Sequence, residues 1–195
     1  LCKNTIISFL SNSKTNEINV LMREYRKNLP LLEEKIKNLK ILDPACGSGA
    51  FLIKAVDTLL NIYNEIQNIK QEEGEYEAIN KIGKLQKKGL KESTLTLNKY
   101  QEEDEIRKII ENNIYGVDLN EESVEITKLS LFLKIATPQR KLIDLSNNIK
   151  CGNSLINDKN LDKKGFDWKN EFPFSFDIII GNPPYIKIKQ KKNLY

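Results

Sequence analysis

The 195-residue sequence contains no histidine. A Ser-His-Asp triad and acid–base catalysis by an imidazole are therefore excluded. Cysteine is scarce as well, because Cys2, Cys46 and Cys151 are odd in number and lack the spacing of zinc ligands. The sequence predicts no metal site.

Long hydrophobic runs are also missing. No apolar run approaches the ~18 residues of a membrane span, and the first residues lack the layout of a signal peptide. The composition, 39% hydrophobic and 30% charged, is that of one globular domain with a core. We expect a cytoplasmic protein without membrane association.

The net charge of +4 is small, so it is compatible with a polyanionic partner but does not by itself indicate one. Residues 186–195 carry four lysines and no acid, which suits either a solvated surface or contact with phosphates. The chain begins at Leu1 and stops ten residues after Tyr185. We expect that both ends are cut from a longer protein.

Residues 1–40 have the apolar spacing of two or three short helices, interrupted at Pro30. This segment shows no residue pattern with chemical function. We expect it to pack on the domain formed by residues 41–195.

That domain opens with an apolar strand from Ile41, a turn of small residues up to Gly49, and a helix with apolar spacing from Leu52 to Ile66. A glycine-rich turn of this kind lets a ligand approach the backbone amides at a helix N-terminus.

Three ligand classes compete for the turn. A nucleotide P-loop requires Gly-Lys-Ser/Thr, and no lysine occurs before Lys54. A dinucleotide fingerprint requires a third glycine where Leu52 stands, so this class is disfavoured. S-adenosylmethionine has no phosphates, and its ammonium group favours a nearby carboxylate such as that of Asp43. A turn that binds nothing would not require this run of residues.

Residues 70–105 contain seven lysines and nine acidic residues. We expect a helical, solvated insertion with turns at Gly74, Gly83 and Gly89. It lengthens the connection to the next strand well beyond a minimal βαβ unit.

A second strand is predicted over residues 114–117, ending at Asp118, with Asn120 as the cap of the next helix. An acid at this strand tip commonly holds a ribose diol, although a plain strand-end aspartate is the alternative.

A third strand is predicted over residues 149–151, followed by a small polar turn at 152–155 that could touch the adenine of the same cofactor. The aromatic residues between 157 and 175 favour core or lid packing over base stacking.

The last stretch, residues 176–185, reads Phe-Asp-Ile-Ile-Ile-Gly-Asn-Pro-Pro-Tyr. Its three isoleucines predict a strand buried on both faces. Asn182 precedes a proline, and Pro183 and Pro184 carry no backbone N–H, so the turn is stiff and rich in acceptors. With the ring of Tyr185, it suits a flat group that bears an amine.

Four motifs occur in order: Asp43-Pro44-Ala45-Cys46-Gly47-Ser48-Gly49, Gly116-Val117-Asp118, Gly152-Asn153-Ser154-Leu155 and Asn182-Pro183-Pro184-Tyr185. Together they resemble the N6-adenine DNA methyltransferases, most of all those of type IIG restriction-modification enzymes and related phage-defence systems. The resemblance covers almost the whole chain.

The resemblance implies an α/β fold, with the mostly parallel, Rossmann-like sheet of S-adenosylmethionine-dependent methyltransferases, flanked by helices and incomplete at the C-terminal end. It implies double-stranded DNA with a flipped adenine as partner, and a fused or partner restriction nuclease and target-recognition domain outside these residues. The family's N-terminal Tyr/Phe-Thr-Pro motif is absent. In the family's sheet order the fourth strand is central.

The resemblance also implies roles for single residues. The methionine part of the cofactor would be lined by Asp43, Ala45, Gly47 and Gly49. The ribose and adenine would contact Asp118 and Leu119, and the adenine edge would face Asn153, where the family commonly has aspartate. The target base would be held by Asn182, Pro183, Pro184 and Tyr185.

An exocyclic adenine amine needs pyramidalisation rather than a strong base, because its lone pair is delocalised into the ring. The side-chain oxygen of Asn182 and the carbonyl of Pro183 would each accept one N–H, and Tyr185 would stack on the base. Two rivals stay open: an amino methyltransferase for protein glutamine or RNA guanine, and a non-catalytic fragment that binds cofactor or DNA.

Overall fold

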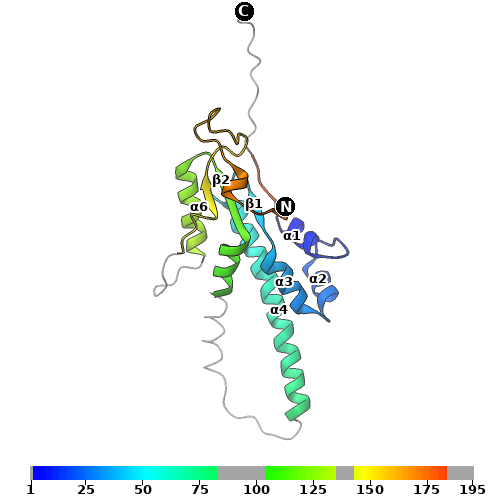
Figure 1. Cartoon of the computed structure of the whole chain (residues 1–195). Coiled ribbons are helices and arrows are strands. Elements are labelled where there is room, and N and C mark those ends of the chain that lie inside the picture. The colour runs from blue at the N-terminus through cyan, green and yellow to red at the C-terminus, as the bar shows by residue number, and fades with distance from the viewer. Residues whose placement is uncertain (1, 83–103, 135–142, 184–195) are drawn as a thin grey trace, which may run out of the picture.

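A computed structural model of the chain describes residues 2–82, 104–134 and 143–183 (Figure 1). Its centre is a parallel sheet of four strands in the order β3-β2-β1-β4. The strands are β1 (Ile41–Asp43), β2 (Ile114–Asp118), β3 (Ile149–Cys151) and β4 (Ile178–Ile179). The parallel sheet with flanking helices is therefore confirmed, and so are the predicted positions of β1, β2 and β3.

Helices connect and cover the strands. Their bounds are α1 (Cys2–Leu10), α2 (Ile18–Tyr25), α3 (Leu29–Asn38), α4 (Ala50–Ile82), α6 (Glu121–Leu133) and α7 (Trp168–Glu171). Residues 104–113 are also helical and lead directly into β2. No helix among the described residues is both long and apolar enough to cross a membrane.

Pro30 lies inside the first turn of α3 rather than between two helices. Its missing N–H has no partner to lose at that position, and its fixed φ is already helical. The side chain of Asn28 caps the same turn by accepting a hydrogen bond from the Leu31 amide at 3.3 Å. The proline that was expected to break the helical run therefore helps to begin a helix.

One face of the sheet carries the main core. The side chains of Ile41 in β1 and Ile178 in β4 lie opposite each other in the register and pack into this core with residues of α1 and α4. Ile6, Leu52 and Leu59 are among its fully buried members. α1 and α4 contact the strands, and α2 and α3 pack against α1 and α4 (Figure 1).

The other face of the sheet carries a cluster of aromatic rings. Its members are Tyr115, Phe166, Trp168, Phe172, Phe174 and Phe176, whose ring centroids lie 4.7 to 6.5 Å apart. Leu42 and Val117 pack against these rings from the strands. The aromatic residues of the β3–β4 connection therefore pack on the sheet, as the sequence indicated.

The expectation of a turn at Gly74 is wrong. Gly74 forms no turn, because α4 continues through it to Ile82, and a glycine inside a helix costs only ~1 kcal/mol. Gly83 and Gly89, the other expected turns, lie outside the described residues. Figure 1 shows that the far end of α4 extends away from the sheet.

Ile179 contradicts the expectation that β4 is buried on both faces, because it is 65% exposed while Ile178 and Ile180 are buried. Its register partner Leu42 lies on the aromatic face of the sheet. In the part of the chain that the structure describes, β4 pairs only with β1, so no neighbour covers Ile179 at this edge.

Candidate active site at the carboxyl edge of the sheet

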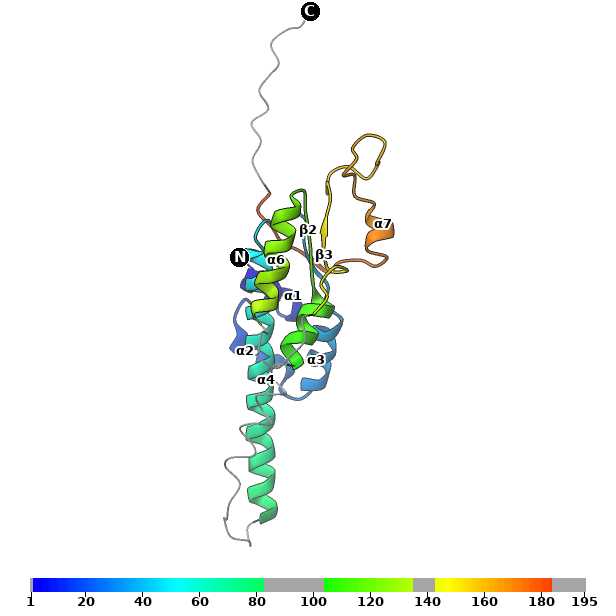
Figure 2. The ribbon, with the colours of Figure 1, turned by 90° about the vertical axis from the view of Figure 1, so that its left-hand side faces the viewer.

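The four strands end at one edge of the sheet, which lies opposite the C-terminal end of α4 at Ile82 (Figures 1 and 2). Asp43 and Asp118 are the last residues of β1 and β2, and Asn153 and Asn182 follow β3 and β4 by two or three residues. In open parallel sheets, ligands bind at this carboxyl edge. Pro184 and Tyr185 lie outside the described residues.

The glycine-rich turn between β1 and α4 has a left-handed backbone at Gly47 (φ +52°) and Gly49 (φ +82°). A Cβ on Gly49 would lie 2.9 Å from a methyl carbon of Thr127 in α6. Both the left-handed backbone and the lack of space therefore require glycine at this position. The Thr127 hydroxyl donates a hydrogen bond to the Gly47 carbonyl at 2.7 Å. Thr127 was not recognisable from sequence patterns, because the contact joins residues 80 positions apart.

Asp118 connects the end of β2 to this turn. Its Oδ2 accepts a hydrogen bond from the Gly47 amide at 2.8 Å, and its Oδ1 accepts one from the Asn120 amide at 2.9 Å. Asn120 in turn caps α6 by accepting hydrogen bonds from the Glu122 and Ser123 amides, which confirms the predicted cap. Each Asp118 oxygen keeps capacity for one further donor.

Asp43 is fully buried at the end of β1. Its Oδ1 accepts a hydrogen bond from the Ala45 amide at 3.0 Å, whereas its Oδ2 has no partner among the described residues. Burial raises the pKa of this carboxyl to about 6 despite that hydrogen bond, and the charge of Asp118 raises it further. A buried carboxylate oxygen without a donor marks a place for a donor or cation from outside the chain.

Gly181 brings the end of β4 against Asp43. A Cβ at this position would lie 2.7 Å from Asp43 Oδ1, so only glycine fits without displacement of the carboxylate. Asn182 and Pro183 follow directly and are exposed. The sequence indicated Gly181 only as the end of a strand, and its pairing with Asp43 became visible through the β1–β4 register.

Of the two cysteines near the edge, Cys46 does not supply a nucleophile. Burial, together with the charges of Asp43 and Asp118, raises the pKa of the Cys46 thiol to about 12, so it stays protonated at neutral pH. Cys151 is exposed, with its sulfur 3.6 Å from the Leu119 carbonyl. Within the described ranges there is also no group of three potential metal ligands.

Leu119 and Asn153 complete the edge beyond β2 and β3. Leu119 is half exposed, and its carbonyl accepts a hydrogen bond from Lys164 Nζ at 3.0 Å. The Asn153 side chain donates to Asp162 Oδ2 at 2.7 Å and accepts from the Leu155 amide at 3.1 Å. The structure thus brings the predicted residues 43, 118, 119, 153 and 182 to one edge.

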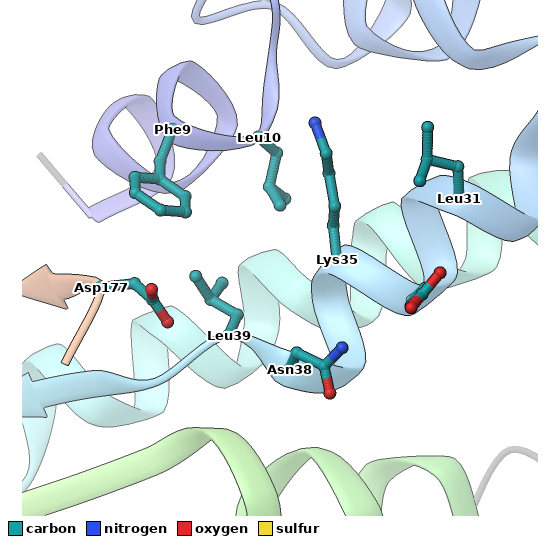
Figure 3. Close-up of a pocket in the computed structure, with 8 residues that line it drawn as sticks. Phe9, Leu10, Leu31, Lys35, Asn38, Leu39 and Asp177 are labelled. Atoms are coloured by element: carbon teal, nitrogen blue, oxygen red, sulfur yellow. The ribbon is translucent and has the colours of Figure 1, made fainter. Parts of the chain in front are cut away.

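A cavity of about 460 Å³ lies elsewhere (Figure 3). It is lined by Phe9, Leu10, Leu31, Glu34, Lys35, Asn38, Leu39 and Asp177. Leu39 and Asp177 precede β1 and β4, so the cavity is at the amino edge of the sheet, away from Asp43. It takes no part in the candidate site.

The parallel sheet of four strands with flanking helices is that of a Rossmann-like methyltransferase fold. Comparison with family models agrees, because residues 32–134 match the RMKL-like methyltransferase domain and residues 112–195 match the Eco57I restriction-modification methylase. The chain belongs to the restriction-modification methyltransferase family.

Individual relatives point the same way. The chain is 31% identical over 175 residues to the putative type II restriction enzyme and methyltransferase RM.MjaORFECS2P of Methanocaldococcus jannaschii, covering 83% of this chain and 13% of that protein. It is 32% identical over 191 residues to the type II restriction enzyme and methyltransferase RM.Eco57I of Escherichia coli, covering 88% and 17%.

A third relative is the adenine-specific methyltransferase PglX of Lacticaseibacillus casei, 23% identical over 137 residues, with 70% of this chain and 8% of that protein covered. The chain thus spans less than a fifth of the length of these relatives. No solved structure matches it.

Proposed function

We propose that this chain is the catalytic part of a DNA methyltransferase that transfers a methyl group from S-adenosylmethionine to N6 of adenine, within a restriction-modification or phage-defence system. The observation that carries the proposal is the buried Asp43 carboxylate, which has one unpartnered oxygen. It lies between Asp118 at the end of β2 and Gly181 after β4. The names of the relatives, two restriction enzymes and an adenine-specific methyltransferase, favour DNA adenine as the substrate.

The residues at the edge fit this cofactor. Asp43 Oδ2 offers a buried acceptor for the ammonium of the methionine part, and a cation there would offset the charge that burial disfavours. Asp118 has one free acceptor position on each oxygen for the two ribose hydroxyls. The turn at Ala45, Gly47 and Gly49 would line the methionine part, which has no phosphate and so needs no lysine, and Leu119 would lie at the adenine.

When bound, S-adenosylmethionine supplies an electrophilic methyl group on a sulfonium. The chain's own contribution is to orient the amine that receives it. Asn182 Oδ1 and the Pro183 carbonyl each accept one N–H of the adenine amine, which turns the nitrogen lone pair out of the ring plane. Both residues are exposed at the edge, directly after the glycine that contacts Asp43.

Pro184 and Tyr185 complete this acceptor site in the proposal. Pro184 stiffens the turn, and Tyr185 stacks on a base that has left the duplex. No residue of this set has to remove a proton before transfer, because the nitrogen gains the methyl group first and then releases its extra proton to water. The absence of histidine is compatible with such a reaction.

The test is Asn182→Ala in the full-length protein, measured with methyl-labelled cofactor and double-stranded DNA. We expect transfer to fall at least 100-fold, because one of the two oriented acceptors is lost, while the affinity for cofactor changes less than twofold. The matched control is Asn112→Ala, which removes an exposed carboxamide at the opposite edge of the sheet.

The product identifies the substrate. Digestion of DNA methylated by the wild type should release N6-methyladenine. Label found only in protein would point to glutamine, label found only in RNA would point to guanine, and either result would refute the DNA proposal. Cofactor binding without any transfer by the full-length wild type would indicate a binding module.

A further inference from the structure

Residues 153–165, here named the β3 loop, form a compact loop whose two ends meet. The Asn153 amide donates to the Lys164 carbonyl at 2.6 Å, and Asn153 and Gly165 form a bridge. The Phe166 amide then donates to the Ile156 carbonyl at 2.7 Å. A loop closed on itself in this way has the character of an Ω-loop, a class that is frequently functional.

Both polar atoms of the Asn153 side chain form hydrogen bonds within the β3 loop. Its Nδ2 donates to Asp162 Oδ2, and its Oδ1 accepts from the Leu155 amide. Asp162 also accepts the Lys164 amide at 2.9 Å through Oδ1. The Asn153 hydrogen bond is the main reason that the pKa of Asp162 lies below its usual value, so Asp162 is an ionised acceptor at neutral pH.

The β3 loop also reaches the end of β2. Lys164 Nζ donates to the Leu119 carbonyl at 3.0 Å, and the Gly152 amide donates to the Asp118 carbonyl at 2.9 Å. The backbone after Asp118 is therefore held from the side of β3. Figure 2 shows the loop at the end of the molecule where the strands finish.

We propose that Asn153 is a positioning residue that acts through Asp162: the pair closes the β3 loop, and the loop fixes Leu119 through Lys164, so that the adenine side of the cofactor site is preformed. This deepens the proposed function and rests on it. Direct reading of the cofactor's adenine by Asn153 is the competing role, and the two roles predict opposite effects of an aspartate at position 153.

An aspartate at 153 would face the Asp162 carboxylate, where Asn153 Nδ2 now donates across 2.7 Å. It would remove a charge-assisted hydrogen bond and add like-charge repulsion. If residue 153 instead reads the adenine amine, a carboxylate accepts that hydrogen bond at least as well as a carboxamide. Exchanging Asn153 and Asp162 for each other restores one donor and one acceptor to the pair. The side chains at both positions can still accept their hydrogen bonds from the Leu155 and Lys164 amides.

The experiment measures binding of S-adenosylhomocysteine to the purified full-length protein by calorimetry. If Asn153 acts as a positioning residue, Asn153→Asp should weaken binding about tenfold, which corresponds to the loss of one charge-assisted hydrogen bond. The double variant Asn153→Asp with Asp162→Asn should recover most of the loss. Asp162→Ala should weaken binding as Asn153→Asp does. The control is Asp158→Asn, a charge removal in the same loop, which should change binding less than twofold.

Wild-type or tighter binding by Asn153→Asp, or no recovery in the double variant, would overturn the proposal. Hydrogen exchange in the ligand-free protein gives an independent readout. The Asn153 and Lys164 amides should exchange at least fivefold faster in Asn153→Asp and return to the wild-type rate in the double variant. If wild type binds no S-adenosylhomocysteine, the proposed function fails, and the exchange rates still decide whether the pair closes the loop.

Discussion

At the scale of single residues, Asp43 combines burial with an incomplete set of hydrogen bonds. Its environment within the chain offers one backbone amide and a neighbouring acid, Asp118, but no cation among the described residues that contact it. The charged form is therefore disfavoured in the ligand-free fold, and a cationic ligand relieves that penalty.

The pH dependence of unfolding tests this interpretation. The pKa of Asp43, about 6 in the fold, exceeds the ordinary 3.8, so its contribution to stability is complete below about pH 4 and is lost as the pH rises through 6. Relative to Asp43→Asn, ligand-free wild type should lose about 2 kcal/mol of unfolding free energy between pH 4 and pH 8. Urea unfolding of both proteins at the two pH values measures the change.

The same residue should give cofactor binding the opposite pH dependence. S-adenosylhomocysteine should bind more tightly to wild type as the pH rises through 6, because the ligand's ammonium interacts with the ionised carboxylate. Asp43→Asn should bind weakly at every pH.

The unfolding experiment has its own contradicting outcome. If the difference in unfolding free energy between wild type and Asp43→Asn stays constant between pH 4 and pH 8, Asp43 does not titrate as a buried group.

At the scale of elements, the end of β2 and the glycine-rich turn form one hydrogen-bonded unit. Asp118 joins them through Gly47, and Thr127 of α6 closes the other side of the turn. Three elements that are distant in the sequence therefore set the shape of one turn at the candidate site.

Asp118→Ala should weaken binding of S-adenosylhomocysteine about 100-fold, because it removes the two acceptors proposed for the ribose hydroxyls and frees the Gly47 amide. Calorimetry measures the affinity. The matched control is Glu122→Ala, which removes an exposed acid from the first turn of α6. Equal affinity in wild type and Asp118→Ala would contradict the ribose assignment.

At the scale of the whole molecule, the described sheet ends at β4, which pairs only with β1 and exposes Ile179. The neighbouring aromatic face also exposes part of Phe174. An unpaired strand edge next to apolar side chains is a template for association with another chain.

We therefore expect the 195-residue chain, when produced alone, to self-associate and to have little methyltransferase activity. Ile179→Lys should shift it toward the monomer in sedimentation experiments, because a charge at an edge strand opposes strand addition. Leu161→Lys is the control, since it replaces a highly exposed apolar residue in the loop after β3, the strand at the other end of the sheet from β4. A monomeric and active wild-type chain would refute this expectation.

The sequence by itself determined the parts of the molecule that depend on short-range patterns. Apolar runs located β1, β2 and β3, and the residue after β2 that caps α6 was recognisable from its type and position. The glycine-rich turn and the Asn182 turn were visible for the same reason. Their order along the chain was enough to indicate the family.

Only the tertiary structure decided the environments of these residues. The burial of Asp43, its raised pKa and its contact with Gly181 depend on which strand lies beside β1. The exposure of Ile179 depends on the absence of a described neighbour beyond β4, and the engagement of Asn153 depends on a loop that folds back over nine residues. Burial and close contacts arise from packing between distant segments, which local propensity does not encode.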